Sequence, residues 1–155
     1  MHRSVPDEFG VRDGDLVEIV LPNDLRAVRP PEEQIMRELL QRRYSDECRF
    51  AIRLALEEAL TNAVRHGNRN DASKRLRIRY HISPKRVIIA VRDEGAGFRL
   101  DRVADPTKQE NLERPSGRGI MLMNAYMTKV RYNETGNEVW LLKERAARAK
   151  PVSRK

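Results

Sequence analysis

Residues 58–68 are Glu58-Ala-Leu-Thr-Asn62-Ala-Val-Arg-His66-Gly67-Asn68, and two glycine-rich stretches follow them along the chain. These stretches are Asp93-Glu-Gly95-Ala-Gly97-Phe98 and Ser116-Gly117-Arg118-Gly119-Ile120. A pair of glycines alone most often marks a tight turn. The order of the three stretches, with a carboxylate and an amide four residues apart in the first, is much more specific and indicates that they meet at one site.

The first stretch belongs to a helix predicted over about residues 46–66. On a wheel of 100° per residue, Asn62 and an apolar stripe fall within ~60° of Glu58. Arg53 and Glu57 lie ~100–180° away and form an i, i+4 ion pair. We therefore expect Glu58 to face the site and Glu57 to face solvent.

Strict alternation over residues 75–82 predicts a strand with one covered and one solvated face. The apolar side chains are Leu76, Ile78, Tyr80 and Ile82, and the polar ones are Arg75, Arg77, Arg79 and His81. Further strands are predicted at 16–21, 87–91, 129–132 and 138–142, and further helices at 31–43 and 117–127. Without βαβ repeats, this order favours an α/β (α+β) two-layer sandwich, in which helices cover one face of a mixed, mostly antiparallel sheet.

Composition predicts one cytoplasmic domain. The chain has 155 residues, 39% of them hydrophobic, and no apolar run approaches the ~18–20 residues that span a bilayer. No secretory signal is visible, and the lone Cys48 fits a reducing compartment. We expect the domain at 14–145, an N-terminal extension at 1–13 and a disordered basic tail at 146–155.

The net charge of +8 is unevenly distributed. Residues 141–155 hold six basic residues and one acid, and the segment from Arg65 to Arg92 holds nine basic residues against one acid. The tail and the arginine face of the 75–82 strand are either solvated or attract an acidic protein. Nucleic-acid binding is disfavoured, because Tyr80, the only aromatic residue nearby, lies on the apolar face.

The residue types of the three stretches suit a nucleotide. Asp93, at a strand end, can accept a hydrogen bond from the adenine amine, and Gly95 and Gly97 let the backbone approach the base. Gly117 and Gly119 precede a helix, so their N–H groups can face phosphate oxygens, with Arg118 as a cationic contact. The oxygen of Asn62 suits Mg²⁺, and Glu58 can accept a proton from a nucleophile that attacks the γ-phosphate.

The three stretches resemble the N, G1 and G2 boxes of the ATPase superfamily shared by gyrase, Hsp90, histidine kinases and MutL. The resemblance is strongest to its anti-sigma-factor serine kinase branch (RsbW-like) and covers about residues 14–145. Further similar stretches are Asp105-Pro-Thr, Glu110-Asn-Leu and Gly136-Asn-Glu-Val. The resemblance implies a Bergerat-type histidine-kinase-like ATPase fold, with residues 98–116 as an ATP lid.

Carried over to this chain, the resemblance implies Glu58 as the catalytic carboxylate and Asn62 as the Mg²⁺ ligand of bound ATP. Asp93, Gly95 and Gly97 would hold adenine, and Gly117 and Gly119 the phosphates. His66 matches the first box, either as a phosphate contact or as a residue that caps the helix or packs the pocket floor.

The function implied is that of an anti-sigma factor and protein serine/threonine kinase. It would hold a sigma factor and phosphorylate a STAS-type anti-anti-sigma protein. The alternative is a module that binds ATP or ADP and switches partners without transferring phosphate. Whether the protein forms a homodimer, as some relatives do, stays open.

Overall fold

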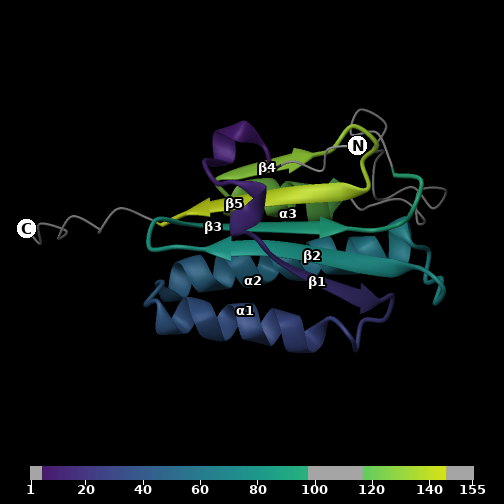
Figure 1. The fold of residues 1–155 in the computed structure, drawn as a ribbon, viewed down its shortest axis with the longest axis horizontal. Coiled ribbons are helices and arrows are strands. Elements are labelled where there is room, and N and C mark those ends of the chain that lie inside the picture. Colours follow the sequence, from purple (N-terminus) through teal and green to yellow (C-terminus); the bar gives the residue numbers. More distant parts are fainter. Residues whose placement is uncertain (1–4, 98–116, 146–155) are drawn as a thin grey trace, which may run out of the picture.

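A computed structural model describes residues 5–97 and 117–145, with Gly117 and Arg118 described by their backbone alone. Five strands form one sheet in the order β1-β2-β3-β5-β4, and every described pairing is antiparallel. They are β1 (Val17–Pro22), β2 (Arg75–Ile82), β3 (Arg86–Arg92), β4 (Lys129–Tyr132) and β5 (Glu138–Glu144). Helices α1 (Arg29–Gln41), α2 (Asp46–Thr61) and α3 (Gly117–Tyr126) cover one face (Figure 1). The predicted two-layer fold is confirmed.

The main core lies between these helices and the sheet. Ser45 is the N-cap of helix α2, and its Oγ accepts the backbone N–H of Cys48 at 3.1 Å. Its buried residues include Ile52, Leu56 and Leu60, which share one cluster with the apolar face of β2. The alternation predicted for β2 therefore orients its apolar side chains correctly.

The other face of the sheet is covered in part by residues 5–15, which we call the N-terminal strap. It contains two 3₁₀ turns, η1 (Asp7–Phe9) and η2 (Asp13–Asp15), and lies across the sheet opposite the helices (Figure 1). Phe9 is fully buried in a second apolar cluster formed with Val5, Ile88, Ala90, Trp140 and Leu142. Glu8 fastens the strap to β4 through an ion pair with Arg131 at 2.6 Å.

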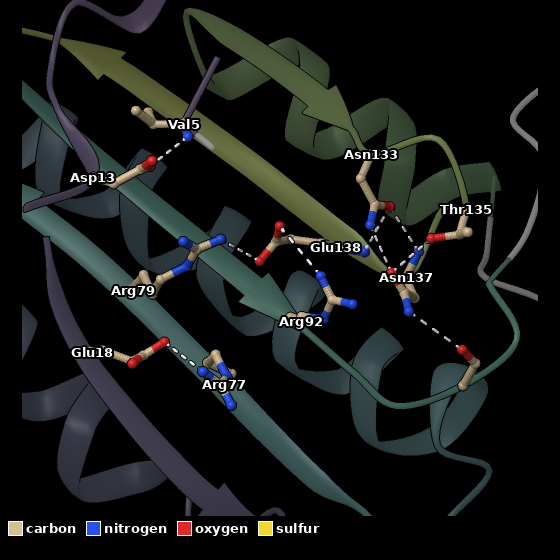
Figure 2. Close-up of polar contacts among 11 residues, drawn as sticks. Val5, Asp13, Glu18, Arg77, Arg79, Arg92, Asn133, Thr135, Asn137 and Glu138 are labelled. Atoms are coloured by element: carbon tan, nitrogen blue, oxygen red, sulfur yellow. Dashed lines mark hydrogen bonds and ion pairs between the residues drawn. The ribbon is translucent and has the colours of Figure 1, made fainter. Parts of the chain in front are cut away.

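The strand prediction is wrong for Arg79, which is only 8% exposed on the supposedly solvated face. Its Nη2 lies 2.9 Å from Glu138 Oε2 (Figure 2). Its guanidinium carbon lies 4.7 Å from the centroid of the Trp140 ring. Two residues earlier, Arg77 pairs with Glu18 of β1 at 2.8 Å near the surface. The sequence pattern separates the two faces of a strand, but it cannot show that a distant segment and a buried acid cover part of the second face.

Two predicted segments, the lid at 98–116 and the tail at 146–155, lie outside the described residues. Residues 5–13, assigned to the N-terminal extension, lie within the strap. No helix in the described part of the chain combines the length and apolar composition that a membrane crossing requires.

Candidate nucleotide-binding site

The helix that carries the first stretch changes its winding at Asn62. Helix α2 ends at Thr61, and residues Asn62–Gly67 continue it as a π-helix, η3. The N–H of Asn68 bonds to Ala63 O at 2.8 Å, the i→i+5 spacing of a wide turn. The prediction of an α-helix to residue 66 is therefore wrong over its last turn, and the 100° spacing no longer fixes the direction of His66.

The side chains of Glu58 and Asn62 lie against Gly119 in the first turn of α3, and we call this place the first corner of the site. A Cβ built on Gly119 would lie 2.6 Å from Glu58 Oε2 and 3.5 Å from Asn62 Nδ2. Any side chain at this position would therefore displace the Glu58 carboxylate. The second and third stretches of sequence were expected to converge with the first, and here the third one does.

The amide of Asn62 has hydrogen-bonding capacity that the described residues do not use. Its Nδ2 is buried and has no hydrogen-bond partner among them. Most buried polar atoms in folded proteins are hydrogen-bonded, so such an atom at a glycine-lined corner is typical of a ligand site. Turning the amide by 180° would place Oδ1 there instead, which is the ligand type that Mg²⁺ prefers. The residues present thus fit the implied metal.

Asp93 lies at a second corner, beside the end of η3. Its Oδ1 accepts the backbone N–H of Gly95 at 2.8 Å. A Cβ on Gly67 would lie 2.1 Å from Asp93 Oδ2, and one on Gly95 would lie 2.0 Å from Gly67 O. The absence of side chains at these two glycines is therefore what lets the strand end, the π-helix and the turn come together.

The Asp93 carboxyl is poorly compensated for its burial. It is 8% exposed. Burial raises its pKa from 3.8 to about 6, against the Gly95 N–H bond and the charges of Lys74 and Arg92, which lower it. A carboxylate held this way gains from any ligand that brings a hydrogen-bond donor.

Asn68 and Asn137 hold the turn that contains Asp93, one from each side. Asn68 is fully buried, and its Oδ1 accepts the N–H of Glu94 at 2.8 Å. From the other side, Asn137 O accepts the N–H of Asp93 at 2.9 Å. Asn137 belongs to the β4–β5 hairpin, where its side chain bonds with Asn133 and Thr135 (Figure 2). The sequence prediction missed both anchors, although Asn68 ends the first quoted stretch.

Position 97 requires glycine for two reasons. Its φ of +82° lies in the left-handed region, and a Cβ would lie 1.7 Å from Thr135 O of the same hairpin. The turn from Asp93 to Gly97 is thus seated on the β4–β5 hairpin.

The structure brings most of the predicted site residues to the two corners. Glu58, Asn62 and Gly119 share one, while Asp93 and Gly95 share the other, and both corners lie on the α2–η3 helix. His66 is half-buried in η3, and no contact described for it reaches either corner. Gly117 and Arg118 begin α3, as expected for a helix N-terminus, and only their backbone is described. As ligand contacts, all of these assignments stay predictions.

The chain is similar in sequence to several curated bacterial proteins. The chain is 30% identical over 99 residues to an anti-sigma F factor of Oceanobacillus iheyensis, covering 60% of this chain and 67% of the relative. It is 30% identical over 96 residues to the serine-protein kinase RsbW of the same organism, covering 58% and 61%. An anti-sigma F factor of Bacillus thuringiensis is 37% identical over 82 residues, covering 51% and 56%. The chain thus spans somewhat under two thirds of the length of most of these relatives.

A solved structure and a family profile match a larger part of this chain than the curated relatives do. The crystal structure of the RsbU and RsbW domains of a Mycobacterium tuberculosis protein matches with a TM-score of 0.56 and 17% identity, covering 83% of this chain and 31% of that one. At that identity the match shows the fold alone. The profile of the histidine kinase-like ATPase domain matches residues 21–143, which is most of the chain. With this match over the described fold and both corners of the site, the chain belongs to the histidine kinase-like ATPase domain family.

Proposed function

We propose that this protein is an ATP-dependent protein serine/threonine kinase of the anti-sigma-factor type. It phosphorylates a STAS-type anti-anti-sigma protein and, when that antagonist is released, holds a sigma factor. Family membership implies the ATP site. The similarity to anti-sigma F factors and to a serine-protein kinase supports the class of partner and of reaction.

One observation carries the proposal: Glu58 and Asn62 face the same glycine at the start of a helix. A helix N-terminus presents free N–H groups to an anion, so phosphates bound at Gly117 and Gly119 would lie beside a carboxylate and an amide. This is the combination that phosphoryl transfer to a hydroxyl needs.

The roles of the remaining residues follow from their surroundings. Asp93 would accept the adenine amine, and Asn62 would hold Mg²⁺. The bound magnesium nucleotide supplies the phosphoryl group and neutralises its negative charge. Glu58 would orient the serine hydroxyl of the partner and take its proton, with the half-buried position that keeps a base accessible to a protein substrate.

The test is Glu58→Gln, which keeps the shape of the side chain and removes its charge. Calorimetric ATP affinity should stay near that of the wild type. Phosphate transfer from labelled ATP to a candidate STAS-type antagonist should fall by roughly 10²–10⁴-fold, the usual contribution of a general base.

Glu57→Gln is the matched control on the same helix. Glu57 is exposed and lies 4.0 Å from Arg53, so its loss should leave transfer almost unchanged. Equal activity of the two variants would remove Glu58 from the mechanism. A wild-type protein that binds ATP and transfers no phosphate to its cognate antagonist would instead be a nucleotide-dependent binding module.

A further inference from the structure

Asn68 occupies a position that the proposed chemistry does not yet use. It is fully buried just after η3, at a point where four separate segments of the chain meet. Its Nδ2 donates to Asn23 Oδ1 and to Arg75 O, each at 3.0 Å, and its Oδ1 accepts the N–H of Glu94 at 2.8 Å. Every one of these partners comes from a different part of the sequence.

These contacts fix the direction of the amide. A side-chain amide has two N–H donors, and both are used here by acceptors on the β1 and β2 side. Turning the amide by 180° would place an oxygen against two oxygens and an N–H against an N–H. Oδ1 of Asn68 is therefore held towards Glu94.

The N–H of Glu94 belongs to the peptide group that leaves Asp93. The N–H of Asp93 itself is held by Asn137 O at 2.9 Å, so both peptide groups that flank Asp93 are fixed. These two bonds fix the backbone on both sides of Asp93, and the N–H of Gly95, 2.8 Å from Oδ1, holds the carboxylate itself. The position of the Asp93 carboxylate is thus defined by Asn68 on one side and by the β4–β5 hairpin on the other.

We propose that Asn68 is a positioning residue that sets the selectivity of the site for adenine over bases without an exocyclic amine. The proposal rests on the assignment of Asp93 as the acceptor for that amine. A hydrogen bond discriminates between bases only when its acceptor cannot move, because a mobile carboxylate can turn away from a base that offers no donor.

The experiment compares ADP with inosine diphosphate, which carries a carbonyl oxygen where adenine carries the amine. Wild-type protein should prefer ADP by roughly 10- to 100-fold, the range expected for a hydrogen bond to a charged group. In Asn68→Ala the preference should fall to about threefold or less, mainly through weaker ADP binding. Calorimetry at a temperature well below the melting point of each variant supplies both affinities.

Asn23→Ala is the matched control. It removes the same Asn23–Asn68 bond and a contact of Asn23 Nδ2 with Asp71 O at 3.1 Å, but leaves the bond between Asn68 and Glu94. It should lower the melting temperature and keep the ADP preference. If Asn23→Ala loses the preference as fully as Asn68→Ala, general loosening explains both and the proposal is overturned.

Asn68→Asp keeps an oxygen for the Glu94 N–H and should retain most of the preference at reduced stability. If Asn68→Ala does not fold, Asn68→Ser replaces it, because the shorter hydroxyl cannot span the same gap. An unchanged preference in the folded variant would refute the role of Asn68. Failure of wild-type protein to bind ADP would instead refute the proposed function itself.

Discussion

Two buried acids lie one register position apart at one end of the sheet, and they differ in how their burial is compensated. Glu138 of β5 is 2% exposed and is paired with Arg79 at 2.9 Å and Arg92 at 3.9 Å. Asp93 follows Arg92, the register partner of Glu138, and is 8% exposed. The one described hydrogen bond of its carboxyl group comes from the backbone N–H of Gly95, and burial raises its pKa to about 6.

The difference separates a structural charge from a functional one. Two guanidinium groups compensate the burial of Glu138, so this acid completes the outer face of the sheet. The burial of Asp93 is left partly uncompensated, and the fold carries that cost at a position where a ligand can relieve it. Perturbed acids of this kind concentrate at functional sites.

The largest effect should come from Glu138→Gln. Removing the acid breaks its buried ion pair with Arg79 and its longer pair with the half-buried Arg92, and breaking a buried pair typically costs about 3–5 kcal/mol of stability. Urea unfolding followed by circular dichroism should show the loss, while ADP affinity of the folded protein changes much less. A loss under 1 kcal/mol would mean that Glu138 is not needed to compensate the arginines.

Asp93→Asn should behave in the opposite way. Its amide nitrogen would face the adenine amine donor to donor, and ADP affinity should fall at least about tenfold, equivalent to 1–3 kcal/mol. Stability should be unchanged or slightly higher, because the uncompensated charge is gone. Calorimetry gives the ADP affinity, and urea unfolding of the same preparation gives the stability. If Asp93→Asn lost as much stability as Glu138→Gln, the distinction between the two acids would be wrong.

The pH dependence sharpens the same contrast. Because the pKa of Asp93 is raised from 3.8 to about 6 by folding, its stabilising contribution is complete below pH 3.8 and is lost as pH rises through about 6. Wild type should therefore gain stability relative to Asp93→Asn as pH falls from 7 to 4. ADP binding should weaken below about pH 6 and release protons near that pH, an effect that Asp93→Asn should lack in titrations with buffers of different ionisation enthalpy.

The smallest effect is expected at Arg77, in contrast to its neighbour on the same face. Arg77→Ala breaks an exposed ion pair with Glu18 and should lower the free energy of unfolding by less than about 1 kcal/mol. Because salt screens exposed pairs, this loss should become smaller as the salt concentration rises. Arg79→Ala should cost several times more, because Glu138 loses its shorter ion pair. Charge reversals that probe partner docking on this strand should therefore be made at Arg75 and Arg77. Equal unfolding curves for Arg77→Ala and Arg79→Ala would contradict the burial of Arg79.

Local patterns predicted the elements and the convergence at the site. The alternation in β2 gave its bounds, the Ser45 cap gave the start of α2, and the one-turn spacing of Glu58 and Asn62 brought both to Gly119. These features depend on periodicity and on short-range hydrogen bonds, which the sequence contains.

The features that were missed depend on contacts between distant segments. The burial of Arg79 requires Glu138, and the anchoring role of Asn68 requires Asn23, Arg75 and Glu94. The π-helical turn at Asn62 also ends in this network, through the N–H of Asn68. No local pattern encodes which distant partner satisfies a buried amide or guanidinium.

The N-terminal strap has a consequence for how the chain folds as it is synthesised. Its residues leave the ribosome long before β4 and β5, yet its apolar residues pack with Trp140 and its Glu8 pairs with Arg131. Closing a contact over nearly the whole described chain is slow, and it must wait for the final strands. The first described residues to be made are therefore among the last to reach their place, and until then the apolar side chains of β3 and β5 on this face lack the cover of Val5 and Phe9.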